Sequence, residues 1–393
     1  NLQPGADGSV VAHGAGVRVD DLHLSGDSIT LNAGSTSNNI QLTPAVGGKV
    51  VVGEKLVRAT PFRGAVTIEE VAAAAGVSRS TVSRVVNGST AVSPAALDAV
   101  NRAIAELNYV PNRAARSLAS RQTRALALVV PEDTTRFFGD PFFAAIVSGI
   151  NAGLRSSDYV LNLFIASDDP GDKTTSYLRS GSVDGALIAS HHTSDTFIDR
   201  IAAAVPVVYG GRPVRERATD YYVDVDNVRA GYDATRYLIE RGYTDIGTIT
   251  GPLTMPGGVD RLAGYRRALA EAGLPEGAHA DGGFTTDGGA SAMRRILSAG
   301  PAPRALFIAS DLMAQGAISV LAGAGLKVPA DVAIIGFDDS PVAETVDPPL
   351  TTIRQPSFEQ GEHMVSVLLD LLAGGTPPHA TILDTELIVR QSS

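Results

Sequence analysis

From Arg124 onward, short apolar runs alternate with helical stretches, and this alternation limits the folds that the chain can adopt. The runs are "ALALVVP", "YVLNLFIAS", "VDGALIAS", "VPVVYGG", "DIGTITG", "ALFIAS" and "VAIIGFDD". Strands that are apolar along their whole length and alternate with helices are typical of parallel sheets covered by helices on both faces. The sequence therefore predicts an α/β fold, and 393 residues are enough for two such lobes.

A helical zone precedes this body. The stretch "TIEE" at 67–70 has the pattern of a capping box and predicts a helix that ends at Gly76. Ser78 is expected to cap a second helix, and Ser93 is expected to cap a third, "SPAALDAVNRAIAELN". Two short helices joined by a tight turn and followed by a third predict a helix-turn-helix module. Its small core is expected to contain Val71, Ala75, Val77, Val82 and Val85.

The second of these helices has two unlike faces. Val82, Val85 and Val86 share one face at helical spacing and are expected to point inward. The other face gathers small polar and basic side chains: Arg79, Ser80, Ser83, Arg84 and Asn87. Short hydroxyl side chains let a helix approach phosphates closely, and an arginine can donate two hydrogen bonds to a guanine edge. An amphipathic surface helix would share this pattern, but the combination favours a helix that lies in a DNA groove.

The charge is unevenly distributed along the chain. Residues 63–124 hold eight arginines, no lysine and four acidic residues, a net charge of +4 in a chain whose net charge is −10. The first 62 residues carry −1, and the remainder carries −13. A basic module joined to an acidic body indicates that one part binds phosphates while the rest has another task.

Composition and motifs exclude several classes of function. The chain has no cysteine, which excludes disulfides, thiol catalysis and cysteine-ligated zinc. It has no run of eighteen apolar residues, and its start lacks the pattern of a signal peptide, so we expect a cytoplasmic protein with no membrane partner. "GDSI" at 26–29 is similar to an esterase motif but lies in a short strand-like zone, and no phosphate-binding GxxxxGK[ST] loop occurs. His191 and His192 are adjacent and would point apart on a strand. We therefore expect no enzyme, no metal and no cofactor.

The segment from 66 to 121 resembles the DNA-binding headpiece of the LacI family of bacterial transcription regulators. The similarity rests on "VTIEEVAAAAGVSRSTVSRVVNG", "VSPAALDAVNRAIAELNYVPNRAARSLAS", "IIGFDDSPVAETVDPPLTTIRQP" and "ELIVRQSS", and it extends over residues 66–391. The resemblance implies a two-lobed core similar to periplasmic binding proteins, with an effector cleft between the lobes. It also implies a repressor that reads a pseudo-palindromic operator as a homodimer, and the absence of leucine heptads after "VRQSS" favours a dimer over a tetramer.

Carried over position by position, the resemblance assigns roles in DNA binding. Arg79, Ser80 and Arg84 would read bases. "NRAARSLA" at 112–119 resembles a hinge helix, with Leu118 as the side chain that enters the minor groove. The residues expected to complete the DNA-binding set are Thr67, Ser78, Thr81, Ser83, Asn87, Asn112 and Ala115.

Polar and aromatic residues follow the ends of the predicted strands, where ligands bind in open parallel sheets. The resemblance places Phe143, Arg261 and Asp338 at effector positions of the family, and Ser310 where many relatives have asparagine. Arg212 follows Gly211, which falls where some sugar-responsive members have a carboxylate. The expected effector-binding set is Phe142, Phe143, Arg212, Arg261, Ser310, Asp311 and Asp338. Helix capping by Asp311 or Asp339 and burial of Phe142 in the core are the alternatives. The set suits a sugar, with hydroxyls for the charged groups and an apolar ring face for the aromatic ones.

These observations divide the chain into three parts. Residues 1–62 form a β-rich extension of unknown role that could be a fused segment, and 63–124 form the DNA-binding module with its hinge helix. Residues 125–393 form the effector-binding and dimerisation core, with lobe 1 at about 125–223 and 354–382. Lobe 2 spans about 224–353 and takes the C-terminal strand. A small-molecule-binding protein of the transport type is the alternative, although such a protein needs a signal peptide and has no helix-turn-helix module.

Overall fold

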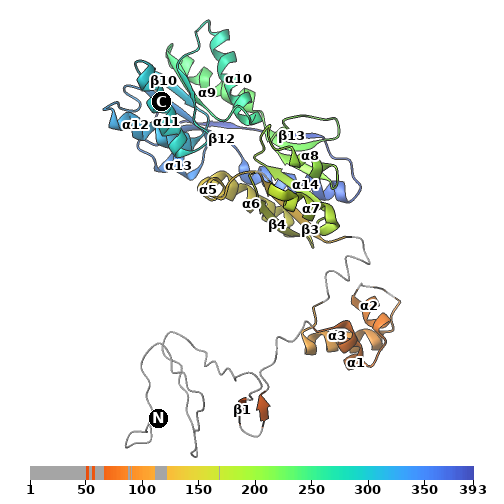
Figure 1. Cartoon of the computed structure of the whole chain (residues 1–393). Coiled ribbons are helices and arrows are strands. Elements are labelled where there is room, and N and C mark those ends of the chain that lie inside the picture. Colours follow the sequence, from red (N-terminus) through yellow and green to blue (C-terminus); the bar gives the residue numbers. More distant parts are fainter. Residues whose placement is uncertain are drawn as a thin grey trace, which may run out of the picture. The chain divides into compact units, whose positions relative to one another are not determined.

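The computed structural model divides the chain into two compact units, residues 1–111 and residues 112–393 (Figure 1). The described residues are 66–86, 89, 91–110, 122–167 and 169–393, together with the backbone of 50–52 and 55–57. The first unit contains three helices of the expected helix-turn-helix module, and the second contains two six-stranded sheets.

The N-terminal extension contributes one described pair of strands. β1 (Val50–Val52) runs antiparallel to β2 (Lys55–Val57). Both strands lie in the extension 1–62, which the sequence predicts to be β-rich. The other strands expected before residue 50 lie outside the described residues.

Local signals position the helices of the first unit, which are α1 (Ile68–Ala75), α2 (Arg79–Val86) and α3 (Pro94–Leu107). The capping box is present: Glu70 N donates to Thr67 Oγ1 at 3.3 Å, and Thr67 N donates to the Glu70 carboxylate at 2.7 Å. Gly76 ends α1 with a φ of +65°, a conformation that glycine adopts without steric cost. The turn between α1 and α2 thus follows from residues adjacent to it in the chain.

The three helices share a small hydrophobic core. Val71, Val82 and Val100 are fully buried, and Ala72, Ala103 and Tyr109 complete the cluster. Ala75, Val77 and Val85 are partly buried and pack against it. The valine face of α2 therefore points inward, which leaves its hydroxyl and arginine face to solvent.

Lobe 1 of the second unit is built on a parallel sheet with the strand order β13-β7-β6-β5-β3-β4. Its strands are β3 (Ala125–Val130), β4 (Val160–Ile165), β5 (Gly185–Ala189), β6 (Val207–Gly210), β7 (Tyr221–Val225) and β13 (Ala380–Leu383). Its helices are α5 (Thr134–Gly139), α6 (Pro141–Leu154), η1 (Pro170–Asp172), α7 (Lys173–Tyr177), η2 (Leu178–Ser182), α8 (Phe197–Ala202) and α14 (Ser357–Leu372).

Lobe 2 is built on a second sheet with the order β14-β12-β11-β10-β8-β9, in which only β14 is antiparallel to its neighbour. Its strands are β8 (Ile246–Thr250), β9 (His279–Asp281), β10 (Ala305–Ile308), β11 (Ala333–Asp338), β12 (Thr351–Arg354) and β14 (Glu386–Ile388). Its helices are α9 (Asn227–Glu240), α10 (Pro256–Glu271), α11 (Thr286–Ala299), α12 (Asp311–Gly323) and α13 (Pro341–Thr345).

Helices cover both faces of each sheet, as the apolar strands predict. Along β3, Leu126 and Leu128 join a hydrophobic cluster with α6 and α14, whereas Ala127 and Val129 join a separate cluster on the opposite face. In lobe 2, α9 and α10 pack on one face and α11 and α12 on the other (Figure 1). The α/β architecture predicted from the sequence is confirmed.

The chain passes between the lobes three times. It leaves lobe 1 between β7 and α9, returns between β12 and α14, and crosses again between β13 and β14. In lobe 1 the helices α6 and α14 pack closely against each other. At Gly149 there is no room for a side chain, since a Cβ atom there would lie 1.9 Å from Phe358 O. This contact fixes the first turn of α14, which begins directly after the second crossover.

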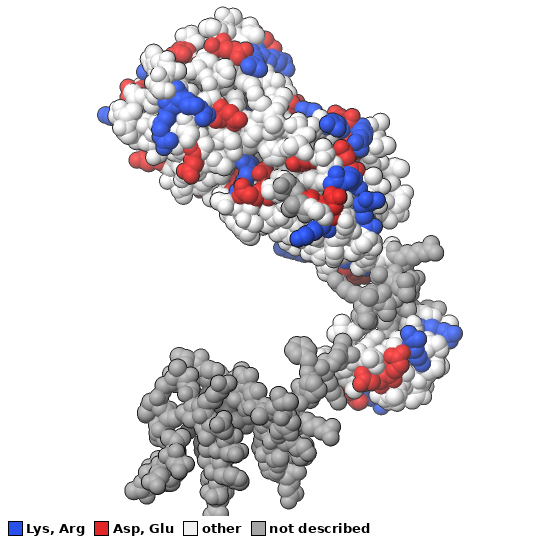
Figure 2. Space-filling model, viewed as in Figure 1, with Lys and Arg blue, Asp and Glu red and all other residues white. Residues whose placement is uncertain are grey.

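The surface of the second unit is mixed in charge. On the face drawn in Figure 2, basic and acidic side chains are interspersed over both lobes and do not gather into one basic patch. Within the described part of the chain, no helix combines the length and the apolar character needed to cross a bilayer.

Candidate functional site

The polar face of α2 is accessible to solvent. Ser78, Arg79, Ser80 and Arg84 are exposed, and Thr81 and Ser83 are half-buried. The three hydroxyls at the start of the helix form one cluster, because Ser78 Oγ lies 2.8 Å from Ser80 Oγ and 2.9 Å from Thr81 Oγ1. Hydroxyls and free backbone N–H groups at a helix N-terminus suit a phosphate oxygen. The arrangement therefore agrees with the DNA-binding face predicted for this helix.

Arg79 and Thr67 of the expected DNA-binding set also have partners inside the first unit. Arg79 Nε lies 2.9 Å from Glu69 Oε1, and both side chains are mostly exposed. Such an exposed ion pair contributes at most about 1 kcal/mol, so Arg79 can exchange Glu69 for DNA at little cost. The Thr67 hydroxyl accepts the capping hydrogen bond of α1. Asn87, Asn112, Ala115 and Leu118 lie outside the described residues.

A cleft lies between the two lobes, and the empty space within it, open solvent included, is about 690 Å³. Its walls come from the carboxyl ends of strands in both sheets. Five residues of the expected effector set line it: Phe142, Arg212, Arg261, Ser310 and Asp338. The other polar residues of the walls are Arg136, Asp140, Ser190, His191, Asp224, Asn227, Gln355 and Gln360.

Arg261, on α10, is the central side chain of the lobe 2 wall. It is 7% exposed, and its guanidinium lies 3.4 Å above the centroid of the Phe337 ring. The guanidinium donates to three acceptors from different elements: Asn227 Oδ1 at 2.9 Å, Ala309 O at 2.6 Å and Gln355 Oε1 at 2.8 Å. Arg261 therefore ties together the two crossovers that flank the cleft.

Asp338 faces Arg261 from the end of β11. Its Oδ1 lies 3.7 Å from Arg261 Nη1, and burial raises the pKa of the Asp338 carboxyl well above its usual range, although Arg261 opposes this shift. The φ of Asp338 is +107°, a conformation that costs a side-chain-bearing residue on the order of 1 to 3 kcal/mol. Strain of this kind is typical of residues that the fold holds in place at binding sites, and Asp338 lines the cleft.

Protein groups also join the lobes directly across the cleft mouth. The Arg212 guanidinium, at the end of β6, forms a two-pronged pair with the Asp260 carboxylate of α10, at 2.9 to 3.1 Å. Arg136 Nη1 donates to Gly283 O at 2.7 Å, and Thr193 N donates to Thr254 O at 3.0 Å. Arg212 lines the cleft, but much of its hydrogen-bonding capacity is directed to this contact between lobes.

His191, at the end of β5, is buried in the neutral form. Its Nε2 accepts from Val214 N at 3.2 Å, and burial, followed by the neighbouring His192, lowers the pKa of His191 to about 4. In the unfolded chain the ring titrates near its usual pKa of about 6.5, so between these values only the unfolded state takes up the proton. The contribution of neutral His191 to stability is thus present above pH 6.5 and is lost as the pH falls toward 4.

We expect this loss to reach about 2 to 3 kcal/mol in the free energy of unfolding, on the scale of 1.4 kcal/mol per pKa unit. Urea denaturation at pH 7 and pH 4.5 checks it, with His191→Gln as the comparison, because glutamine can still accept from Val214 N. The buried cleft carboxyls shift stability in the opposite direction, but they do so equally in both proteins. Equal pH dependence of the two proteins would contradict the assignment.

Two members of the expected effector set do not line the cleft. Phe143 is 1% exposed and packs in the core with Phe137, Ile146 and Ile150, while its neighbour Phe142 lines the cleft. On a helix, adjacent side chains point in directions about 100° apart, so the two phenylalanines meet different surroundings, the core for Phe143 and the cleft for Phe142. Phe143, Ile146 and Ile150 recur at helical spacing in the sequence, and this spacing predicts that they share a buried face.

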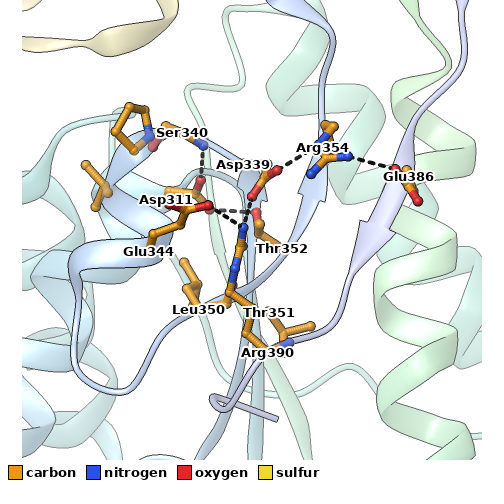
Figure 3. A network of polar contacts seen from close by, with 12 residues as sticks. Asp311, Asp339, Ser340, Glu344, Leu350, Thr351, Thr352, Arg354, Glu386 and Arg390 are labelled. Carbon is orange, nitrogen blue, oxygen red and sulfur yellow. Dashed lines mark hydrogen bonds and ion pairs between the residues drawn. The ribbon is translucent and has the colours of Figure 1, made fainter.

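Asp311 is the second member of the expected set that does not line the cleft. It is fully buried behind the cleft, where Oδ1 accepts from Thr352 Oγ1 at 2.6 Å and Oδ2 accepts from Ser340 N at 2.8 Å. Figure 3 shows this carboxylate beside a second polar group, in which Asp339 pairs with Arg354 and Arg390. Asp311 therefore joins α12 to the ends of β11 and β12 and has a structural role.

Sequence reasoning missed several polar residues of the walls. Asp224 ends β7 and accepts from Arg212 N at 2.7 Å, so its position at a strand end was a usable signal. Arg136, Gln355 and Gln360 follow no such rule, since they lie in a short helix, in a crossover and in the first turn of α14. Only the tertiary fold brings them to the cleft.

Family models match the helical module and much of the two-lobed unit. The family model "Bacterial regulatory proteins, lacI family" matches residues 67–112, and the model "Periplasmic binding protein-like domain" matches residues 235–393. The chain is 47% identical to the HTH-type transcriptional regulator CelR of Thermobifida fusca, over 83% of this chain and 98% of that protein.

Solved structures give the same result. A complex of the transcriptional regulator CelR with cellobiose is similar, with a TM-score of 0.67, 44% identity and coverage of 84% of this chain and 100% of that one. The Lac repressor dimer bound to operator and the anti-inducer ONPF has a TM-score of 0.73 and 29% identity, with coverage of 84% and 99%.

Proposed function

Because the chain belongs to the LacI family of bacterial regulatory proteins, we propose that a neutral sugar in its interlobe cleft controls the binding of α2 to an operator. It is a ligand-responsive transcription regulator. Residues 63–124 would bind DNA and residues 125–393 would bind the effector, and we propose no catalytic role and no function for residues 1–62. Such a regulator works in the cytoplasm, where the operator is.

On DNA, the regulator would act as a homodimer and a repressor. The similar Lac repressor was solved as a dimer on its operator, and two copies of α2 related by a two-fold axis would read two half-sites of a pseudo-palindrome. The exposed hydroxyls of Ser78, Ser80 and Thr81 would hold phosphates, and Arg84 would read a base.

The ligand class rests on one observation, the pairing of every arginine that lines the described cleft. Arg136 lies 3.2 Å from the Glu132 carboxylate and 3.8 Å from that of Asp140. Arg212 pairs with Asp260, and Arg261 pairs with Asp338. A phosphate or carboxylate ligand would have to displace one of these carboxylates or lie beside it, at an electrostatic cost. The charge balance therefore favours an uncharged ligand.

The shape of the walls favours a sugar among uncharged ligands. Phe142, Met255 and Phe284 supply apolar surface, and polar groups of both lobes converge between them. Apolar walls with a few oriented polar groups suit a ring with an apolar face and hydroxyls at its edge. Since a relative of 44% identity was solved with cellobiose, a glucose disaccharide is the first ligand to test.

The test is calorimetry and thermal unfolding of the full chain with cellobiose, ribose and glucose 6-phosphate. We expect cellobiose to bind and to stabilise the fold by about 2.7 kcal/mol at a concentration 100 times its Kd. The phosphorylated sugar should bind at least roughly tenfold more weakly than a neutral one, because the cleft arginines are already paired. Tighter binding of glucose 6-phosphate than of any neutral sugar would contradict the proposal.

A further inference from the structure

Gln360 occupies the first turn of α14 and lines the cleft from lobe 1. Its side chain is 2% exposed, and its Nε2 donates to Val223 O at 2.8 Å. The carbonyl of Val223 cannot donate, so this hydrogen bond fixes which end of the amide is the nitrogen. The Oε1 atom therefore has a defined direction, away from Val223, in a residue that lines the cleft.

Oε1 of Gln360 is buried and has no hydrogen-bond partner among the described residues. Buried side-chain oxygens are nearly always satisfied, because an acceptor taken out of water without a donor is costly. An unsatisfied acceptor in the wall of a binding cleft indicates that the missing donor belongs to the ligand.

The neighbouring cleft donors are committed elsewhere. The Arg212 guanidinium is directed to Asp260, and each nitrogen of the Arg261 guanidinium already donates to Asn227, Ala309 or Gln355. The short contact between α6 and α14 at Gly149 also prevents the first turn of α14 from shifting toward another partner. The fold thus holds Oε1 in place, and neither Arg212 nor Arg261 donates a hydrogen bond to it.

We propose that Gln360 is a specificity-determining residue whose Oε1 accepts a hydrogen bond from one hydroxyl of the effector. This inference rests on the proposed function and adds a requirement to it: at one position the sugar must carry a donor. An ether, a fluorine or a hydrogen at that position leaves Oε1 unsatisfied in the complex. A site built around a buried polar group rejects such analogues more strongly than an apolar wall rejects an added hydroxyl.

The proposed contact would also let one ligand bind to both lobes at the crossover between β12 and α14. Gln355 follows β12 and accepts from Arg261 of lobe 2, and Gln360 lies five residues later in lobe 1. A sugar held by Asp338 in lobe 2 and by Gln360 in lobe 1 would span this crossover. Loss of the Gln360 contact should therefore remove a ligand contact made by lobe 1 and leave the contact with Asp338 of lobe 2 in place.

The experiment is calorimetry of the full chain with cellobiose and with its series of monodeoxy analogues, in the wild type and in Gln360→Met. Methionine has similar length and no acceptor of comparable strength, and Val223 O keeps a second donor, Gly211 N at 2.8 Å. Gln315→Met, on α12, is the matched control, because that glutamine lies outside the cleft and its Oε1 already accepts from Thr286.

We expect one deoxy analogue to bind the wild type at least roughly tenfold more weakly than cellobiose. In Gln360→Met the same analogue and cellobiose should bind within about threefold of each other, because the lost hydroxyl no longer has a partner. Gln315→Met should keep the wild-type profile. Gln360→Leu replaces Gln360→Met in the same series if the methionine variant does not fold.

An identical analogue profile in the wild type and in the Gln360 variant would overturn the contact while leaving the sugar-binding function intact. Failure of the wild type to bind cellobiose or any other neutral sugar would overturn the proposed ligand class, and the contact with it. The two failures are therefore distinguishable in one data set.

Discussion

Arg261→Met should abolish effector binding and lower the free energy of unfolding by about 3 to 5 kcal/mol, the usual cost of removing one partner of a buried ion pair. The substitution leaves the Asp338 carboxyl without its counter-charge and removes the donor to Asn227, Ala309 O and Gln355. Urea denaturation measures the loss of stability, and calorimetry with cellobiose measures the loss of binding.

Arg266→Met is the matched control on the same helix. Arg266 is about half exposed, and its Nε pairs with Glu276 at 3.0 Å. We expect this variant to lose less than about 1 kcal/mol and to bind the effector normally, because exposed ion pairs contribute little. Similar losses in the two variants would show that the burial of Arg261 does not matter.

A double variant separates the structural role of Arg261 from its role in binding. Arg261→Met combined with Asp338→Asn removes both charges, so neither remains buried and uncompensated, and asparagine tolerates the positive φ at this position. Much of the stability should return, since no unpaired charge is left buried. Effector binding should stay lost. Recovery of binding together with stability would show that neither residue contacts the ligand.

Arg84→Ala should weaken binding to the operator by about 1 to 3 kcal/mol, a loss of roughly 5- to 150-fold, the range for one two-pronged contact to a base. Arg84 is exposed in the last turn of α2, on the face opposite the buried Val82. Binding to random-sequence DNA should change little. The operator is first obtained by selection from a random pool, and gel-shift titrations at one fixed salt concentration then give both affinities.

Arg84→Lys distinguishes a base contact from a phosphate contact. Lysine keeps the charge but lacks the planar fork of donors that matches a guanine edge. If Arg84 reads a base, lysine should lose most of the operator specificity. Equal losses on operator and random DNA in Arg84→Ala, restored by lysine, would instead make Arg84 a phosphate contact.

The sequence alone determined the features that depend on residues close together in the chain. The capping box of Thr67 and Glu70, the left-handed Gly76 and the inward valines of α2 each involve neighbours within a few positions, so local chemistry was sufficient. The apolar strands likewise specified two-sided sheets, and the strand-end rule placed Ser310 and Asp338 at the cleft, whereas Arg261 on α10 was assigned by the family resemblance. Phe143, which the family resemblance places at an effector position, lies in the core, and the helical period of the sequence predicts this burial.

Only the tertiary structure decided which residues join the two lobes at the cleft and which polar side chains pair with one another there. The pairs Arg212–Asp260 and Arg261–Gln355 join residues 48 and 94 positions apart, and Asp311 reaches Thr352 across 41 positions. Such partners are set by the order of the strands and by the approach of the two lobes, which no local pattern encodes. The orientation of Gln360 has the same origin, because its amide is aligned by Val223, 137 residues earlier in the chain. Local propensity acts over a few residues, whereas a binding site forms where long-range packing brings distant strand ends and helix termini together.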